Sequence, residues 1–231
     1  MYGEAAGKYP HVFSPLRVKN IIYKNRLCST TMSTVPTHTH LSSTNYGGIG
    51  IYDKALGGVA MIGMMYHGKA GASHYEANGA DPFASKYDLD VLREGAADLV
   101  LLGRSLVADP FWSKKVLEGR EDDIVPCIRC NNCYHIATEH FNTCCTVNPR
   151  VYRENRVPLT PPRAQTARSV VVVGGGPAGL KAALTAAQRG HQVTLVEQSG
   201  ALGGLMIPAS VGAFKEDLRR YLSYLRRQVE K

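Results

Sequence analysis

The chain has 231 residues, of which 44% are hydrophobic and 20% charged, so it can bury a core and is not a disordered protein. Its net charge is +8, but the basic residues do not form one run with interleaved aromatic side chains, so we expect no nucleic-acid partner. No run of about eighteen apolar residues is present, so we expect no membrane span. Residues 1–14 lack the apolar core of a secretory signal, which predicts a cytoplasmic protein with reduced cysteines.

Strands and helices alternate in the first half of the sequence, which predicts an α/β layer or barrel. The predicted elements are short extended segments at 11–24, a strand at 26–31, a helix at 49–56, a buried strand at 59–66, a helix at 87–95, a buried strand at 98–103 and a helix at 109–119. Asp109 is expected to be the N-cap of the last helix, with Pro110 at its first position and Gly119 past its end. Cys28 is expected to be a small core residue.

The second half begins with a Pro- and Arg-rich linker at 151–168. From Ser169 a strand, a glycine turn, a helix and a second strand follow in order, and an amphipathic helix is predicted at 213–231. Its apolar residues recur at helical spacing: Phe214, Leu218, Leu222, Leu225 and Val229. Its basic residues are expected to form a solvated face: Lys215, Arg219, Arg220, Arg226, Arg227 and Lys231.

Five of the six cysteines lie between Pro126 and Pro149. Three stand at three-residue steps, as Cys127, Cys130 and Cys133, and a fourth ligand can come from the neighbouring pair 144–145. Such a thiol set suits a [4Fe–4S] cluster or a structural zinc ion. Three cysteines in one run with a fourth at a distance favour the cluster, and unliganded surface thiols are the third interpretation.

A glycine-rich turn follows the valine-rich strand at 169–173. The spacing Gly174-x-Gly176-x-x-Gly179 opens a helix, and the acidic residue Glu197 ends the next strand. This combination is typical of a dinucleotide site, with the pyrophosphate at the helix N-terminus and the acid on a ribose. The fingerprint leaves the choice between FAD and NAD open.

Several segments together resemble one family, the old yellow enzyme-like NADH:flavin oxidoreductases and 2,4-dienoyl-CoA reductases, which carry FMN, FAD and a [4Fe–4S] cluster. The similar segments are "FSPLRVKNIIYKNRLCSTTM", "AADLVLLGRSLVADPFWSKKVLEGREDDIVPCIRCNNC", "CTVNPR", "VVVVGGGPAGLKAA" and "GALGG". The resemblance touches nearly the whole chain. It implies an ene-reductase that passes electrons from NAD(P)H through FAD, the cluster and FMN to the activated C=C bond of an enone or enoyl substrate.

The resemblance also implies site residues. FMN would contact Thr31, Met32 and Ser33, and its phosphate Gly103 and Arg104. The cluster would be held by Cys127, Cys130, Cys133 and Cys145, because "CTVNPR" matches the segment that holds the last cluster cysteine. FAD would bind Gly174, Gly176, Gly179, Glu197 and Gly204. No residue can be assigned as the catalytic acid.

The fold class implied is α/β, with a partial TIM-barrel segment at 1–125, a cluster segment at 126–150, the linker, and a partial Rossmann-like unit at 169–231. A full barrel needs about 250 residues, and barrel strands are missing near 74–80. The sequence therefore looks internally deleted and C-terminally truncated. Open barrel edges predict a homo-oligomer or a partner subunit. The alternative function is a non-catalytic electron-transfer or cofactor-binding remnant that acts beside such a partner.

Overall fold

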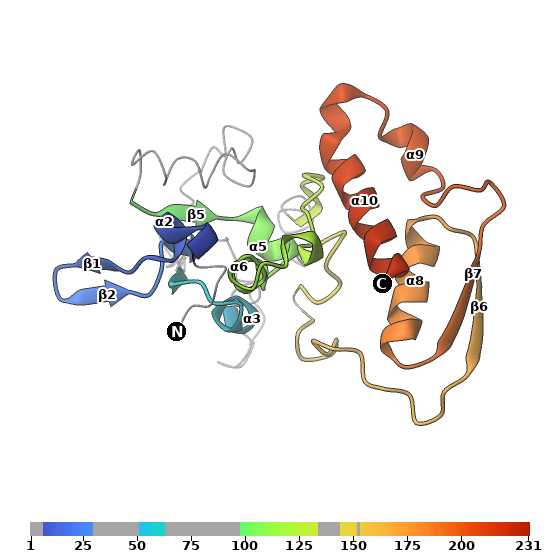
Figure 1. Cartoon of the computed structure of the whole chain (residues 1–231), viewed down its shortest axis with the longest axis horizontal. Helices are drawn as coiled ribbons and strands as arrows, with labels where there is room; N and C mark the ends of the chain where they lie inside the picture. Colours follow the sequence, from blue (N-terminus) through green and yellow to red (C-terminus); the bar gives the residue numbers. More distant parts are fainter. Residues whose placement is uncertain (1–6, 30–50, 63–97, 134–143, 152) are drawn as a thin grey trace, which may run out of the picture. The chain divides into compact units, whose positions relative to one another are not determined.

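The computed structural model describes residues 7–29, 51–62, 98–133, 144–151 and 153–231 (Figure 1). The chain divides into two compact units. The first comprises Met1–Ile124 and Cys130–Tyr152, and the second comprises Val125–Arg129 and Arg153–Lys231. No helix in the described ranges is long and apolar enough to cross a membrane.

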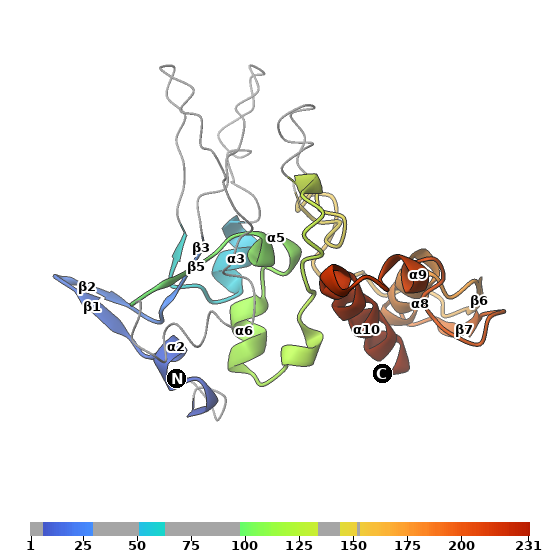
Figure 2. The ribbon, with the colours of Figure 1, turned by 90° about the horizontal axis from the view of Figure 1, so that it is seen from above.

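The first unit is built on a small parallel sheet. Its described elements are α2 (Pro10–Phe13), β1 (Leu16–Val18), β2 (Ile21–Tyr23), β3 (Leu27–Ser29), α3 (Ile51–Leu56), β4 (Met61–Ile62), β5 (Val100–Leu102), α5 (Arg104–Ala108), α6 (Trp112–Leu117) and the 3-10 turn η2 (Glu121–Asp123). β3 lies between β4 and β5 and pairs in parallel with both, while β1 and β2 form an antiparallel hairpin. The hairpin extends away from the other elements of this unit (Figure 2).

The core of this unit lies around β3 and the helices that follow β5. It comprises Val12, Phe13, Leu27, Val59, Leu102, Leu106 and Val116. Cys28, next to Leu27, is fully buried, and burial raises the pKa of its thiol. The expectation that Cys28 is a core residue is confirmed.

Two sequence predictions are wrong in this unit. Residues 10–13 form the helix α2 rather than an extended segment. Asp109 does not cap α6, which begins at Trp112. Its buried carboxylate instead accepts a hydrogen bond from the Phe111 N–H (3.0 Å) and pairs with the Lys115 ammonium group (2.6 Å). Because residues 109–111 form this turn, α6 begins three residues after Asp109. Gly119 follows the helix with a positive φ of 68°, as predicted.

The second unit has a strand–helix–strand core. Its elements are β6 (Ser169–Val173), α8 (Pro177–Gln188), β7 (Gln192–Val196), α9 (Met206–Ala209), the 3-10 turn η3 (Ala213–Lys215) and α10 (Glu216–Glu230). β6 and β7 pair in parallel over their full lengths, from Ser169 opposite Gln192 to Val173 opposite Val196. α8 lies between this sheet and α10 (Figures 1 and 2). The predicted order of elements from Ser169 is confirmed.

Helix α10 buries one stripe of side chains, namely Tyr221, Leu222, Tyr224 and Leu225. The predicted apolar stripe is correct for Leu222 and Leu225 and wrong for Phe214. That residue precedes the helix in η3, and 84% of its surface is exposed. The aromatic residues of the buried stripe are Tyr221 and Tyr224 instead.

Leu225 supplies a test of this packing. Its side chain is fully buried, whereas Leu205 is 85% exposed. Leu225→Ala should lower the free energy of unfolding of the second unit by roughly 2–5 kcal/mol, because it removes buried methyl groups and leaves a cavity. Leu205→Ala should change it by less than about 0.5 kcal/mol. Urea unfolding followed by circular dichroism would measure both; equal effects would contradict the packing described.

Candidate functional site

The glycine turn between β6 and α8 is shaped by two positions that exclude a side chain. Gly174 has a φ of +99°, and its N–H donates to the Val196 carbonyl (2.8 Å). Gly179 lies in the first turn of α8, where a Cβ would stand 1.9 Å from the Gly174 carbonyl oxygen. The helix can therefore approach the strand only if residue 179 is glycine.

Gly176 has neither the positive φ of Gly174 nor the close contact of Gly179, and nothing lies near its missing side chain. It is the N-cap of α8, with φ −71° and ψ 176°, and no atom is within 4 Å of a Cβ built there. No side chain caps the helix, and Pro177 follows at its first position. The open space thus faces the N-terminus of a 12-residue helix, where backbone N–H groups and the helix dipole favour an anion.

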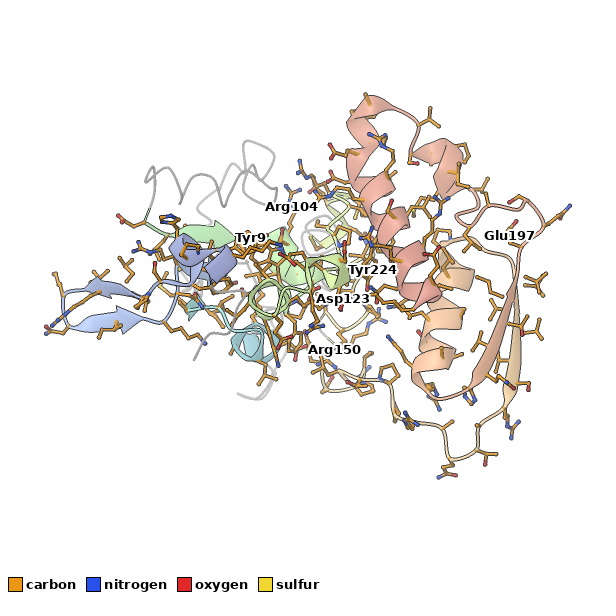
Figure 3. All side chains as sticks on the ribbon, in the orientation of Figure 1. Tyr9, Arg104, Asp123, Arg150, Glu197 and Tyr224 are labelled. Atoms are coloured by element: carbon orange, nitrogen blue, oxygen red, sulfur yellow. The ribbon has the colours of Figure 1, made fainter. Side chains whose placement is uncertain are left out.

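Glu197 follows β7 and lies beside this turn (Figure 3). Its Oε1 accepts a hydrogen bond from the Ser199 N–H (2.8 Å) and its Oε2 one from the Gly175 N–H (2.5 Å). These two backbone donors lower the pKa of the Glu197 carboxyl, the Ser199 contribution being the larger. A carboxylate accepts about four hydrogen bonds, so acceptor positions remain for a ribose hydroxyl.

The segment that contains Gly204 returns to the same turn. The Gly203 N–H donates to the Gly175 carbonyl (2.7 Å), and a Cβ on Gly204 would stand 3.1 Å from the Gly176 Cα. The structure thus brings all five residues predicted for FAD to one place. Sequence reasoning missed Gly175, where a Cβ would stand 2.6 Å from the Leu202 side chain and 3.0 Å from Glu197. The middle glycine of the "GGG" run is the signal that could have identified it.

The cysteines of the predicted cluster segment fall into both units. Cys127 belongs to the part of the chain at 125–129, and its Sγ accepts a hydrogen bond from the Arg129 N–H (3.4 Å). In the first unit, Cys133 is buried with Val107 and Val151, and Cys145 packs against this group. All six cysteines of the chain lie in the described ranges, and none forms a disulfide.

Cys130 and Cys144 share a polar network. The Thr146 hydroxyl lies 3.3 Å from the Cys130 Sγ, and Asn132 donates from Nδ2 to both the Thr146 hydroxyl and the Cys144 Sγ (3.2 Å each). Among the residues that the structure describes, no three His, Cys, Asp or Glu side chains are grouped closely enough to hold a metal ion. The cluster assignment therefore depends on the thiol set and its spacing, and it stays a prediction.

Residues 144–151 are anchored to two helices of the first unit. Asn148 donates from Nδ2 to the Val107 carbonyl at the end of α5 (2.8 Å). Arg150 forms a two-pronged ion pair with Asp53 of α3, with Nε and Nη2 within 2.8–3.1 Å of the carboxylate oxygens. Both side chains are largely buried, at 13% and 3% exposure, so removal of either would leave an uncompensated charge. These contacts fix the chain directly after Cys145.

The residues predicted for FMN are only partly described. Thr31, Met32 and Ser33 lie outside the described residues. Ser29 at the end of β3 is opposite Leu102 at the end of β5, so the loops after both strands leave the same edge of the sheet. Gly103 and Arg104 follow Leu102 there.

Arg104, labelled in Figure 3, contacts the cysteine segment of its own unit. Its guanidinium donates to the Asn131 Oδ1 at 2.5 Å. Asn131 has a φ of +55°, a conformation that asparagine tolerates better than most side chains. The predicted phosphate arginine and the loop between Cys130 and Cys133 are thereby joined.

Comparison with known proteins places this geometry in context. Residues 169–230 match the family of FAD dependent oxidoreductases. Over 143 residues, 61% of this chain, the sequence is 43% identical to an NADH oxidase of Thermoanaerobacter brockii. Over 136 residues, 58% of the chain, it is 39% identical to a cinnamate reductase of Clostridium sporogenes. The matched segments of this chain are thus similar to parts of an NADH oxidase and a cinnamate reductase, and residues 169–230 to FAD dependent oxidoreductases.

The similarity extends to solved structures. Histamine dehydrogenase from Rhizobium sp. 4-9 superposes with a TM-score of 0.59 at 33% identity, covering 62% of this chain and 21% of that protein. The matched parts cover 22% of the Thermoanaerobacter NADH oxidase and 20% of the Clostridium cinnamate reductase. The chain thus spans about a fifth of these relatives.

The two backbone hydrogen bonds of Glu197 predict a pH-dependent contribution to stability. Glu197→Gln should lower the melting temperature near neutral pH, because an amide cannot accept from both N–H groups. A folded-state pKa below the usual value of about 4.3 means that this contribution is complete above that value and is lost as the pH falls through the lowered pKa. The gap between wild type and variant should therefore close in acid. A gap that stays constant down to low pH, measured by thermal unfolding, would contradict the role of the charge.

Proposed function

We propose that the chain is the cofactor-binding part of a flavin- and iron–sulfur-dependent oxidoreductase of the ene-reductase type. The observation that carries the proposal is the open space at Gly176, at the N-terminus of α8 and beside Glu197. A pyrophosphate needs backbone N–H groups without a side chain in the way, and a ribose needs an acceptor nearby. The match of residues 169–230 to FAD dependent oxidoreductases supports FAD as the dinucleotide.

The cysteine segment would hold the [4Fe–4S] cluster through Cys127, Cys130, Cys133 and Cys145. Such a cluster requires cysteines that are not joined in disulfides, as is the case here. A reducing cytoplasm would keep these cysteines in the thiol form. The anchoring of residues 144–151 supports Cys145, because the buried pair of Arg150 and Asp53 fixes the chain just after it. Asn132 would donate a hydrogen bond to the sulfur of the neighbouring Cys144.

FMN would lie at the edge of the parallel sheet where β3 and β5 end. Gly103 and Arg104 would hold its phosphate, with Thr31, Met32 and Ser33 along its ring. The order β4–β3–β5 supports this assignment, because in a closed barrel the first strand lies between the second and the last. The sheet would then be part of a TIM barrel, whose sites lie at the carboxyl ends of the strands.

When bound, these groups would supply hydride and single-electron transfer from NAD(P)H to the activated C=C bond of an enone or enoyl substrate. The chain's own residues would bind and orient them: the α8 N-terminus a pyrophosphate, Glu197 a ribose and Arg104 a phosphate. The name of the related cinnamate reductase supports an unsaturated acid or its derivative as substrate class.

The alternative function is electron transfer or cofactor binding beside a partner subunit or a second copy. The exposed sheet surface of the second unit favours it. Val171, Val173 and Val196 are 65%, 83% and 48% exposed on β6 and β7. Apolar strand surfaces of this kind are usually covered in a working assembly.

Anaerobic purification of the chain, followed by analysis of iron, acid-labile sulfide, zinc and extracted flavin, tests the proposal. We expect about four irons and four sulfides per chain together with FAD and FMN. Reduction of cinnamate should then be assayed. A cluster and FAD without FMN would favour the electron-transfer alternative, whereas zinc without flavin would overturn both.

The two glycines that open α8 give a sharper test of the dinucleotide site. Gly176→Ala should leave the melting temperature nearly unchanged, because a methyl group meets open space there, yet it should abolish most FAD binding. Gly179→Ala should lower the melting temperature strongly, because its Cβ would collide with a backbone carbonyl. Thermal unfolding and FAD titration distinguish the two. Unchanged FAD affinity in a folded Gly176→Ala variant would contradict the site.

A further inference from the structure

One face of α10 holds the segment that follows β7. We name residues 202–213 the strap. Arg226 donates from both Nε (2.8 Å) and Nη2 to the Leu202 carbonyl at the start of the strap. Arg219, seven residues earlier and so on the same face of the helix, donates to carbonyls at its other end: Ser210 (2.5 Å), Gly212 (2.7 Å) and Ala213 (3.0 Å).

Leu222, which stands between the two arginines in the sequence, packs against the start of the strap. A Cβ built on Gly203 would stand 2.9 Å from both methyl groups of Leu222, so a side chain there would displace this contact. Gly203 also has a φ of +136°, which other residues rarely adopt. The prediction that the basic residues of this helix form a solvated face is therefore wrong for Arg219 and Arg226.

The strap in turn forms one side of the glycine turn. The Gly203 N–H donates to the Gly175 carbonyl, and Gly204 lies against Gly176, whose open side is the proposed pyrophosphate position. Leu202, whose carbonyl Arg226 holds, contacts the backbone of Gly175 through its side chain. The position of this wall therefore depends on α10, although this helix lies outside the glycine fingerprint.

We propose that Arg226 and Arg219 are positioning residues for the dinucleotide, because they hold the strap against the glycine turn. The inference rests on the proposed FAD site and adds residues outside its motif. A guanidinium that donates twice to one carbonyl fixes direction as well as distance, which a lysine cannot do. If the strap leaves the turn in a fraction of molecules, the apparent FAD affinity falls by that fraction.

The test compares FAD binding by the full-length chain and four variants, at a temperature where each is folded. Arg226→Ala should raise the FAD dissociation constant by about tenfold or more, and Arg226→Lys by less. Arg219→Ala, which loosens the far end of the strap, should have a smaller effect. Arg220→Ala is the matched control: that side chain is on the same helix, is 48% exposed and only reaches Asp217 at 4.0 Å. It should leave FAD affinity unchanged.

Limited proteolysis with chymotrypsin adds a readout that a general loss of stability would not reproduce. The exposed residues Leu205 and Phe214, in and next to the strap, supply cleavage sites. Without FAD, Arg226→Ala should be cut there faster than the control, while cleavage elsewhere is unchanged. FAD should protect the wild type at lower concentration than the variant.

Each outcome has a definite meaning. Failure of the wild type to bind FAD overturns the proposed function and this inference with it. FAD binding by the wild type that Arg226→Ala and Arg226→Lys leave at the control value overturns the inference alone. Should Arg226→Ala fail to fold, Arg226→Lys and Arg219→Ala decide the question by the same measurements.

Discussion

The close approach of α8 to β6 is the constraint on which the second unit depends. A Cβ at Gly179 would lie 1.9 Å from the Gly174 carbonyl, so the crossing exists only because residue 179 lacks one. This approach aims the helix N-terminus at the open side of Gly176 and places Glu197 within reach of the turn. Packing and access to the helix N-terminus therefore depend on neighbouring glycines: Gly179 lets the helix pack, and Gly176 leaves open the backbone donors that an anion needs.

The first unit relies on a different kind of constraint. β3 pairs with two strands, but the cysteine segment is fixed by the buried ion pair of Arg150 and Asp53. Such a pair gives little net stability, since both charges lose their hydration, yet it is costly to break and so fixes one arrangement. The pair is suited to holding a segment in place. The hydrogen bond from Arg104 to Asn131 adds a second tie between the sheet edge and the cysteine loop.

The sequence predicted best what is local. The strand, turn, helix and strand from Ser169 follow from a valine run and three glycines, because turn geometry and helix packing act within a few residues. The role of Asp109 could not be predicted from the sequence. The capping rule assigns its carboxylate to the helix N-terminus, but in the structure this carboxylate pairs with the Lys115 ammonium group. The role of Arg226 could not be predicted for a similar reason. The helical pattern indicates a solvated cation, and only the fold brings the Leu202 carbonyl to its guanidinium group. For Cys145 the thiol is visible in the sequence, but its packing is not.

Helix α10 also contacts the part of the cysteine segment that belongs to its own unit. Asp217, in its first turn, pairs with Arg129 at 3.2 Å. Both side chains are partly exposed, so the pair contributes little to stability. Arg129 has a φ of +50°, which costs a residue with a side chain roughly 1–2 kcal/mol. The ion pair and the hydrogen bond from the Arg129 N–H to the Cys127 sulfur hold it there. One helix thus constrains both the chain beside Cys127 and, through Arg226, the wall of the glycine turn.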